Sequence, residues 1–396
     1  MPTSKEKLKI AIIAPPWLSL YPGCYYGIEI VVQNLASTLY RMGHHVELFT
    51  VGGSKTRVDK IYWYHKEDQY KHIHRPYYET SSIILAHIQY ALNIIRNKGY
   101  FDIVHDHNSY LGPAVMANAY DLPPVLHTLH EPFTNKIALE KGLPNNKEMF
   151  EQFKYIKNLY FNGVSKAQIR PAPKAIKNRI KGVVYNGINL DDYKYSAEKD
   201  DYYIFVGSMT QEKGVDVAAR ICFELGLKLK MAGTIGGDIK SPSALRKQLL
   251  KKVRRAREDQ FFAFFKQQVQ SYLRARQIQY IGSVSGEAKK ELYSKAKAFL
   301  NPIDRDEPFG MAVVDALASG TPVVTYRRGA MPEIIRHGFN GFLANNYREF
   351  KQYVKRSGEI DPENCRKSVE KRFSAEVMAD SYINLYRRII GESKKS

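Results

Sequence analysis

The sequence predicts an α/β protein made of two consecutive units, each with a parallel β-sheet. At 396 residues the chain is too long for one ordinary hydrophobic core and suits two domains of roughly 150 to 200 residues. Short runs rich in Val and Ile alternate with stretches of helical periodicity, which is the pattern of βαβ units. The alternation stops at about residues 186–201, where turn residues and charges replace it, and then begins again.

The first unit is expected over residues 1–187. Its strand candidates, in chain order, are LKIAIIAPP, HHVELFTV, FDIVHDH, PPVLHTLH and NLYFNGVS. Between the first two strands, the spacing of apolar residues predicts a helix from about Ile28 to Met42.

The second unit is expected over residues 188–372. Its strand candidates are YYIFVGS, LKLKMAG, IQYIGS, AKAFLNP and TPVVTY, and a helix is expected to open near Gly214, after the first of them. The remaining residues, 373–396, contain SAEVMADSYINLYRRII, which predicts a terminal helix with Ser374 as its N-cap.

The net charge of +20, from 60 basic and 40 acidic residues, indicates either an anionic partner or a solvated basic surface. Residues 240–276 hold 11 Lys or Arg and only 2 Asp or Glu, so nearly half of the excess lies there. Apolar residues recur at helical spacing in this segment and predict one long basic amphipathic helix or two shorter ones: Leu245, Leu249, Val253, Phe261, Phe265, Val269 and Tyr272. The segment either contacts an anionic membrane surface or packs on its own domain with a solvated basic face.

Several protein classes are disfavoured by composition. The apolar runs are shorter than the roughly 18 residues that a membrane span needs. The N-terminal residues have no long apolar region or cleavage site of a signal peptide. Cys24, Cys222 and Cys365 are scattered, without the spacing of a disulfide framework or a zinc site. We therefore expect a soluble protein of the reducing cytoplasm.

Candidate site residues follow the predicted strands. Ligands of open parallel sheets bind beyond the carboxyl ends of the strands, so the loops after the strands are the places to search. Gly27 follows the first strand, His130 follows PPVLHTL, Lys213 follows YYIFVGS and Glu307 follows AKAFLNP. Three of these loops combine a helix start with a glycine or a cation, which suits the binding of a diphosphate.

The order of these motifs resembles that of a known enzyme family. The stretches YGIEIVVQNLASTLYRMGHHVELFTVGGS, HTLHEP, GVSKAQIR, VVYNGINLDDY, FVGSMTQEKGVD and DEPFGMAVVDALASGTPVVTYRRGAMPEIIRHGFNGFL are similar to those of family 4 of the retaining glycosyltransferases. The resemblance runs from about residue 8 to residue 390 and implies the GT-B fold. In that fold two Rossmann-like α/β/α domains face each other across a cleft. The N-terminal domain holds the acceptor, the C-terminal domain holds the nucleotide-sugar, and the terminal helix crosses back to the first domain.

The resemblance also implies roles for individual residues. Glu307 would hold the donor sugar through its hydroxyls, and Lys213 would neutralise the diphosphate. Gly27 would offer its amide to the diphosphate, and His130 would lie near the transferred sugar. The residues expected to contact the rest of the donor are Phe309, Gly310 and Met311, through the backbone at a helix start, and Asp315, at the nucleotide ribose.

Three residues depart from the family pattern. Asp315 stands where the family normally has Glu, and Ser208 stands where it usually has Arg, so one of two diphosphate cations is missing. Tyr26-Gly27 replaces a Gly-Gly pair. These changes would weaken donor binding unless another basic group, such as the segment 240–276, compensates for them.

The resemblance implies a metal-independent, front-face retaining transfer in which preorganised amides and Lys213 stabilise the leaving diphosphate. No cofactor other than the nucleotide-sugar co-substrate is expected. Asp304-Arg305-Asp306 is an Asp-x-Asp triplet, whose carboxylates could ligate Mg²⁺ or Mn²⁺. We interpret the triplet as a solvated loop, because it adjoins the Glu307 motif.

The substrates are less constrained by the sequence. UDP-glucose is the first expectation for the donor and GDP-mannose the second, and the acceptor is expected to be a sugar or a lipid-linked sugar, the latter at the membrane surface. A sugar-nucleotide epimerase of similar fold remains an alternative, as does an impaired homologue that binds an anionic partner or nucleic acid. Nucleic acid is disfavoured, because the basic residues concentrate in one segment and no binding module is recognised.

Overall fold

The computed structural model describes residues 6–24, 27–73, 77–134, 146–236, 239–250 and 259–394, without the side chains of 77–79. The chain forms two compact units. Unit 1 is Met1–Asn189 together with Phe373–Ser396, and unit 2 is Leu190–Arg372. The division therefore falls two residues beyond the expected boundary at 187.

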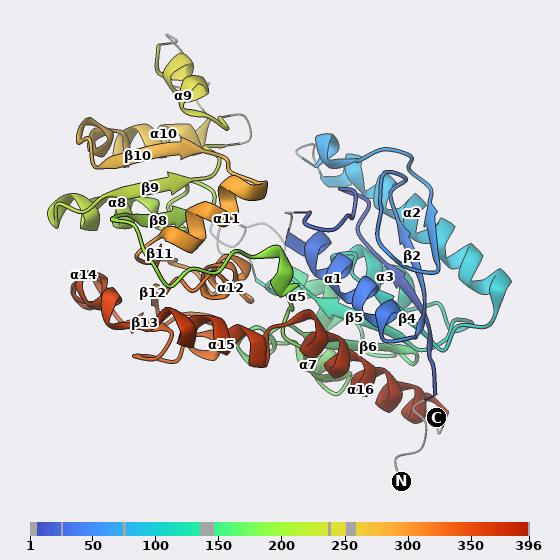
Figure 1. Cartoon of the computed structure of the whole chain (residues 1–396). Coiled ribbons are helices and arrows are strands. Elements are labelled where there is room, and N and C mark those ends of the chain that lie inside the picture. The colour runs from blue at the N-terminus through green and yellow to red at the C-terminus, as the bar shows by residue number, and fades with distance from the viewer. Residues whose placement is uncertain are drawn as a thin grey trace. The chain divides into compact units, whose positions relative to one another are not determined.

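Unit 1 is built on a seven-stranded sheet in which every neighbouring pair is parallel (Figure 1). The order across the sheet is β3-β2-β1-β4-β5-β6-β7. The strands are β1 (Lys9–Ile13), β2 (His45–Thr50), β3 (Lys60–Trp63), β4 (Ile103–Asp106), β5 (Val125–Leu129), β6 (Leu159–Gly163) and β7 (Ile180–Val183). The chain leaves β1 toward β2 on one side and resumes with β4 on the other, so the order reverses between β1 and β4.

Helices cover this sheet and contribute to its apolar core. They are α1 (Gly27–Arg41), η1 (Tyr70–His72), α2 (Tyr77–Lys98), α3 (Leu111–Met116), α5 (Asn146–Glu151), α6 (Lys166–Ile169), α7 (Lys174–Lys177) and α16 (Ala375–Ser393). Buried side chains of α2, such as Ile88 and Leu92, pack with Ile13 and Val104 of the central strands. At roughly 25 cal/mol per Å², such buried aliphatic side chains supply most of the favourable free energy of folding.

The terminal helix α16 is part of unit 1 and lies beside α1 (Figure 1). Its Ser374 N-cap accepts a hydrogen bond from an amide of the first turn. Farther along, the Tyr386 hydroxyl is 2.7 Å from His105 Nδ1, and the Tyr382 hydroxyl is 2.9 Å from Thr128 Oγ1. These buried hydrogen bonds attach the end of the chain to β4 and β5.

Unit 2 contains a six-stranded parallel sheet with the order β10-β9-β8-β11-β12-β13. The strands are β8 (Tyr203–Val206), β9 (Leu229–Ala232), β10 (Ile278–Gly282), β11 (Phe299–Asn301), β12 (Val323–Tyr326) and β13 (Gly341–Ala344). The first strand of the unit is again central, and the order reverses between β8 and β11.

The helices of unit 2 are η2 (Leu190–Asp192), α8 (Val215–Glu224), α9 (Pro242–Leu249), α10 (Gln260–Gln268), η4 (Gln270–Arg274), α11 (Gly286–Lys295), α12 (Met311–Ala318), α13 (Met331–Ile334), α14 (Tyr347–Arg356), η5 (Ser357–Glu359) and α15 (Pro362–Arg372). Most of them lie in the connections between its strands, whereas η2 precedes β8, and α14, η5 and α15 follow β13. Helix α8 has Gly214 as its N-cap, at the expected place.

The described parts of the basic segment form α9, α10 and η4 beside β10 (Figure 1). Residues 251–258, including Val253, lie outside the described residues. Phe265 and Val269 are buried as expected, but Phe262 faces the core in place of Phe261, which is 37% exposed. The reason is local, because the Asp259 carboxylate caps the amides of both Phe261 and Phe262 and so sets where the helix begins.

The prediction of an α/β protein with two parallel sheets is confirmed. The sequence reading missed β3, β7 and β13. Every residue of β3 and β7 is at least partly exposed, so the apolar signal in them is weak. All three cysteine thiols are buried. Within the described residues, no helix combines the length and the apolar character that crossing a membrane requires.

Candidate active site

Two loops of unit 2 meet at the point where its strand order reverses. The loop after β8 carries Lys213, and the loop after β11 carries Glu307. Gly214 has a φ of +75°, and a Cβ atom there would lie 2.1 Å from the Pro302 carbonyl oxygen, so only glycine lets the loops approach this closely. The Asp304 amide also donates to the Glu212 carbonyl at 2.8 Å. The backbone thus holds the two loops together.

This approach brings two cations to one carboxylate oxygen. Lys213 Nζ lies 3.0 Å from Glu307 Oε2, and the Arg305 guanidinium contacts the same oxygen at 3.0 Å through Nε and 2.9 Å through Nη2. Arg305 also reaches Glu212 at 3.3 Å. The Glu307 side chain is 17% exposed and the Lys213 side chain 27%, so the group lies in a partly desolvated place where charges interact strongly.

The pKa values follow from burial and pairing. Burial raises the pKa of Glu307, but the charges of Lys213 and Arg305 outweigh burial and hold this pKa below its ordinary value. Burial lowers the pKa of Lys213, and the Glu307 charge only partly offsets that effect. The two cations are balanced by Glu307 and Glu212, and an anionic ligand that displaces these carboxylates would find both cations in one place.

The Glu307 loop is fixed from behind by the turn after β12. Gly329 has a φ of +49°, and a Cβ there would be 2.5 Å from both the amide nitrogen and the carbonyl oxygen of Glu307. The Gly329 amide donates to Asp306 Oδ1 at 2.9 Å, and the Ala330 amide donates to the Glu307 carbonyl at 3.0 Å. Glu307 therefore lies in the loop, three residues before the cap of α12, and not in the first helical turn.

Both carboxylates of the Asp-x-Asp triplet already accept hydrogen bonds from the protein. Asp306 accepts from the Gly329 amide, and Asp304 Oδ1 lies 2.8 Å from Arg328 Nη1. Across the described ranges, no three His, Cys, Asp or Glu side chains gather as a metal site would require. Asp306 therefore forms part of the scaffold that holds Glu307, whereas the Asp304 side chain pairs with Arg328. The central Arg305 joins the charged group described above.

Helix α12 begins directly after this loop. Gly310 is its N-cap with a φ of +113°, and a Cβ there would lie 2.7 Å from Met331 Cε. Phe309 is buried and Met311 is half-buried. The Val313 amide donates to the Gly310 carbonyl at 3.0 Å. The amides at the start of a helix carry partial positive charge, so those of Met311 and Ala312 suit an anion. Ser208 is exposed in the loop after β8.

Asp315 lies inside unit 2 with both carboxylate oxygens engaged. Oδ1 accepts from the Tyr193 hydroxyl at 2.5 Å, and Oδ2 lies 2.8 Å from Lys289 Nζ. Asp315 is 4% exposed and Lys289 is 7% exposed. Burial lowers the pKa of Lys289, and burial together with the Asp315 charge raises that of Tyr193. A ribose hydroxyl would have to share a carboxylate that these two side chains already hold.

The remaining predicted residues belong to unit 1. Gly27 begins α1 and lines a pocket of about 370 Å³ at the carboxyl ends of β1, β4 and β5. A Cβ at Gly27 would meet no atom within 4 Å, and its φ lies outside the left-handed range. The fold of unit 1 therefore does not require glycine here. Tyr26, its neighbour in the sequence, lies outside the described residues.

His130 is paired with a second histidine. Its Nε2 is 2.8 Å from His107 Nδ1, and the two rings stack. Burial, together with the nearby His127, lowers the pKa of His130 to about 3, so its ring is neutral at pH 7. His107 Nε2 is buried without a partner among the described residues. A buried nitrogen lone pair without a partner costs less free energy than a buried N–H without an acceptor. We therefore place the proton of His107 on Nδ1, from which it is donated to His130 Nε2. The remaining proton of His130 is then on Nδ1, where it can be donated.

The predicted residues lie in both units, and not all of those in one unit meet. Asp315 pairs with Tyr193 and Lys289, apart from Glu307 and Lys213. His130 pairs with His107 and is not among the described residues that line the pocket at Gly27. In unit 2 the structure brings Glu307 and Lys213 together and adds Arg305, Lys289 and Tyr193, which sequence reasoning missed. In unit 1 it adds Glu29 and Asn108 to the pocket at Gly27. Asn108 directly follows the strand candidate FDIVHDH, so a search of every strand-end loop would have found it.

Two family models match the chain in succession. The model described as Glycosyltransferase Family 4 matches residues 25–192, and the model described as Glycosyl transferases group 1 matches residues 190–371. An uncharacterized glycosyltransferase of Methanocaldococcus jannaschii is 24% identical over 361 residues, which are 85% of this chain and 86% of that protein.

Solved structures share the fold at low sequence identity. A sucrose-phosphate synthase from Thermosynechococcus elongatus superposes with a TM-score of 0.71 at 17% identity, over 98% of this chain and 100% of that chain. The Anabaena protein HepE, solved in complex with UDP and glucose, gives a TM-score of 0.65 at 14% identity, over 96% of this chain and 100% of that chain.

Proposed function

This chain belongs to glycosyltransferase family 4 and is a glycosyltransferase with the GT-B fold, and from that premise we propose that it is a retaining, metal-independent hexosyltransferase. The donor is a nucleotide diphosphate sugar, and the acceptor is a sugar or a lipid-linked sugar. Glucose is the first choice for the hexose and mannose the second. HepE, a structural neighbour, was solved with UDP and glucose, which favours UDP-glucose as the first donor to test.

One observation carries the proposal. Lys213 and Arg305 both contact a single oxygen of Glu307, in a strand-end loop that precedes the start of α12. A diphosphate needs cations and amide donors in one place, and a sugar ring needs a carboxylate to accept its hydroxyls. The loops after β8 and β11 together offer both at one point of unit 2.

The chemistry follows from where charge develops. Cleavage of the bond between the anomeric carbon and the diphosphate puts negative charge on the leaving oxygen, and fixed donors lower that barrier most effectively. Lys213, Arg305 and the first amides of α12 supply such donors, including the backbone of Gly310 and Met311. Glu307 then accepts sugar hydroxyls once the donor phosphates replace it as the partner of the cations. The leaving phosphate takes the acceptor proton on the same face of the sugar.

Arg305 takes the place of the cation that is absent at Ser208. Strands β8 and β11 are neighbours, so their loops reach the same region from adjacent positions. Arg305 is joined to Glu307 at 2.9 Å and to Glu212, next to Lys213, at 3.3 Å. The second positive charge therefore comes from the Asp-x-Asp triplet in place of the loop after β8.

The basic segment supports a location at the cytoplasmic face of a membrane. Arg246 and Lys247 of α9 are exposed, and so is Leu250, at 77%. Cations beside an exposed apolar side chain are what an anionic membrane surface attracts. A lipid-linked acceptor would be reached from such a position.

The proposal is tested by thermal stabilisation with UDP, GDP, ADP and their glucose and mannose conjugates, each with and without EDTA. A ligand that binds only the folded protein raises its apparent stability by mass action. We expect a clear shift with one nucleotide, unchanged by EDTA. A shift abolished by EDTA would refute metal independence, and no shift with any nucleotide would refute the donor site. Conversion of the donor sugar to its epimer without acceptor would favour the epimerase alternative.

A further inference from the structure

The pocket of unit 1 has a polar side and an apolar side. It lies at the reversal point between β1 and β4, where ligands of parallel sheets bind. Its polar side comes from Glu29, Asn108, Ser109 and Glu131. No Lys, Arg or His side chain lines it among the residues that the structure describes. The described polar side is therefore rich in hydrogen-bond acceptors, which indicate the chemistry of its ligand.

Asn108 presents an acceptor to this pocket. Its Nδ2 group donates both hydrogens within the protein, to Asp106 Oδ1 at 2.8 Å and to the Ile13 carbonyl at 3.2 Å. The amide group cannot be flipped by a half-turn, because its oxygen would then face the Asp106 carboxylate and the Ile13 carbonyl, and neither of these can donate a hydrogen bond. Oδ1 is buried without a partner in the described part of the chain, and Asn108 is 2% exposed. A buried acceptor of this kind needs a donor from outside.

Glu29 presents a second acceptor. It lies in the first turn of α1 and is 6% exposed. Apart from its own backbone amide, no group in the described ranges is hydrogen-bonded to its carboxyl. Burial raises the pKa of Glu29 to about 7, and the negative charge of Asp68 adds to this effect. Near neutral pH the carboxyl is therefore close to half-ionised, and any second anion beside it would be repelled.

At the rim of the pocket, the Ser109 hydroxyl is already engaged. The Ser109 hydroxyl donates to Glu131 Oε2 at 3.1 Å, which uses its hydrogen. Ser109 has a φ of +23°, and it is the only described residue besides glycine with a positive φ. Strained backbone of this kind persists where the surrounding structure fixes it, as at ligand sites.

The opposite side is apolar and aromatic. Trp17 and Leu18 come from the loop after β1, and Tyr70 and Ile73 come from η1 and the residue after it. The Tyr70 amide donates to the Trp17 carbonyl at 2.9 Å, so the two aromatic segments are held together. An aromatic wall opposite several acceptors matches a sugar ring, whose C–H face is apolar and whose hydroxyls are donors.

We propose that this pocket binds an uncharged, hydroxyl-rich sugar ring, so that the acceptor is a neutral glycoside and not a sugar phosphate or a carboxylic acid. The proposal rests on the proposed function, because it assigns the acceptor of that transfer. A phosphate or carboxylate would place oxygen acceptors next to the acceptor oxygens of Glu29 and Asn108. Those oxygens would then stay buried without a hydrogen-bond donor. Because this costs free energy, the pocket should discriminate strongly against anionic ligands.

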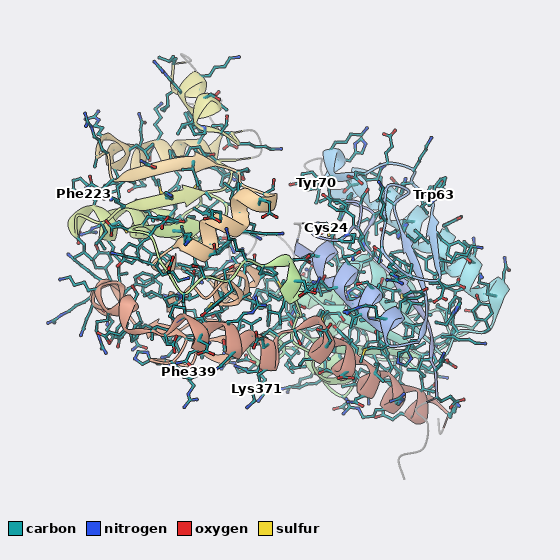
Figure 2. All side chains as sticks on the ribbon, viewed as in Figure 1. Cys24, Trp63, Tyr70, Phe223, Phe339 and Lys371 are labelled. Atoms are coloured by element: carbon teal, nitrogen blue, oxygen red, sulfur yellow. The ribbon has the colours of Figure 1, made fainter. Side chains whose placement is uncertain are left out.

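The test uses the fact that the chain has two tryptophans. Trp63 is 46% exposed and does not line the pocket, and Figure 2 shows it well away from Tyr70. The variant Trp63→Phe therefore leaves Trp17 as the only tryptophan. Its fluorescence is titrated with methyl glucoside, methyl mannoside, glucosamine, glucose 6-phosphate and glucuronate. We expect a neutral glycoside to bind at least tenfold more tightly than either anionic ring. Equal or tighter binding of an anionic ring, or no response to any ring, would overturn the proposal.

A second measurement reports the charge of the pocket through Trp17. Iodide is intrinsically the stronger quencher of indole, so each ion's quenching of Trp17 is divided by its quenching of a free tryptophan amide. On this scale, quenching by caesium in Trp63→Phe should exceed quenching by iodide above pH 7, because a negatively charged pocket attracts the cation. Added to this background, Glu29→Lys should reverse that order and weaken binding of the neutral glycoside, whereas the surface control Glu67→Lys should change neither. Iodide quenching that matches or exceeds caesium quenching on this scale in Trp63→Phe would refute the acidic pocket.

Failure of this proposal is separable from failure of the proposed function. Nucleotide binding is a property of unit 2 and is read from thermal stabilisation, without the acceptor. A protein that binds a nucleotide but prefers a sugar phosphate in unit 1 would keep the proposed function and lose this inference. A protein that binds neutral glycosides but no nucleotide would lose the proposed function.

Discussion

Units 1 and 2 place their candidate sites at equivalent points of similar sheets, but the two sites have opposite chemistry. In unit 1 the order of the strands reverses between β1 and β4, and in unit 2 it reverses between β8 and β11. The unit 2 site gathers two cations around Glu307. The described lining of the unit 1 pocket has carboxyl and amide oxygens and no cation. The sheet therefore determines where a ligand binds, and the loops determine which ligand it is.

The glycines of the two sites also differ in whether the fold requires them. Gly214 in unit 2 is required by the fold, because a Cβ would clash with the Pro302 carbonyl at 2.1 Å. Gly27 in unit 1 has open space around its missing side chain. A glycine that the fold does not require is free to serve a ligand, whose backbone contact a side chain would block.

The largest expected effect is on the unit 2 site. Lys213→Ala and Glu307→Ala should each lower the transfer rate by about 10² to 10³, the usual loss when one preorganised charge-stabilising group is removed. The rate is measured as release of nucleotide diphosphate in the presence of acceptor, and circular dichroism checks the fold. Asp304→Ala is the matched control, because Asp304 belongs to the same loop but pairs with Arg328. Transfer at the native rate in either variant would remove the residue from the site.

Whether a strand could be predicted from the sequence depended on its burial and on the residues around it. The strands LKIAIIAPP and YYIFVGS were identified because buried parallel strands read as continuous apolar runs. The edge strands β3 and β13 were not, since β3 is partly exposed throughout and β13 begins with a glycine and is flanked by Asn340 and Asn345, which are turn residues. The loop with Glu307 was recognisable because its acid, glycine and helix start are adjacent in the sequence.

The rest of the candidate site depends on contacts between distant residues. Arg305 is two residues from Glu307, but its link to Glu212 spans 93 residues. Asp315 was expected to contact a ligand, and its pairing with Tyr193 and Lys289 joins three separate elements. Asn108 presents only its oxygen to the pocket, because its Nδ2 group donates to Asp106 and to Ile13. The contact with Ile13 joins residues far apart in the sequence, so the sequence pattern around Asn108 does not indicate it.

The two carboxyls should give opposite dependences of stability on pH. The pKa of Glu29 is raised to about 7, so the folded state keeps a proton that the unfolded state loses above about pH 4.5. Folding stability therefore falls between pH 4.5 and 7. Glu29→Gln removes this cost and should raise the free energy of unfolding above pH 7 by up to roughly 3 kcal/mol, at 1.36 kcal/mol per pKa unit.

Glu307→Gln should act in the other direction. The pKa of Glu307 is lowered, so its charge stabilises the folded state above the unfolded pKa, and this stabilisation is lost as pH falls through the folded value. The variant should be less stable than the native protein at pH 7 and approach it in acid. Urea unfolding from pH 4 to pH 8 measures both variants. Parallel pH profiles for Glu29→Gln and the native protein would contradict the buried, unpaired state of Glu29.

The smallest expected effect concerns the second cation of unit 2. Arg305→Ala should weaken binding of the nucleotide diphosphate about tenfold, because an exposed charged group contributes about 1.4 kcal/mol when it pairs with a phosphate. Lys213 remains in that variant, so binding should not be abolished. Titration calorimetry measures the affinity, and Arg328→Ala, which removes an exposed arginine paired with Asp304, is the control.

The rescue experiment decides whether Arg305 acts through its charge or through the loop. If Arg305 replaces the cation that is absent at Ser208, then Ser208→Arg should restore nucleotide affinity to Arg305→Ala, since the new guanidinium extends from the same loop as Lys213. If Arg305 only orients Glu307, the added arginine would leave the affinity low, because the carboxylate would still lack its neighbour. In that case unit 2 would neutralise the diphosphate with Lys213 and the α12 amides alone, and the contrast in charge between the two units would be smaller than the structure indicates.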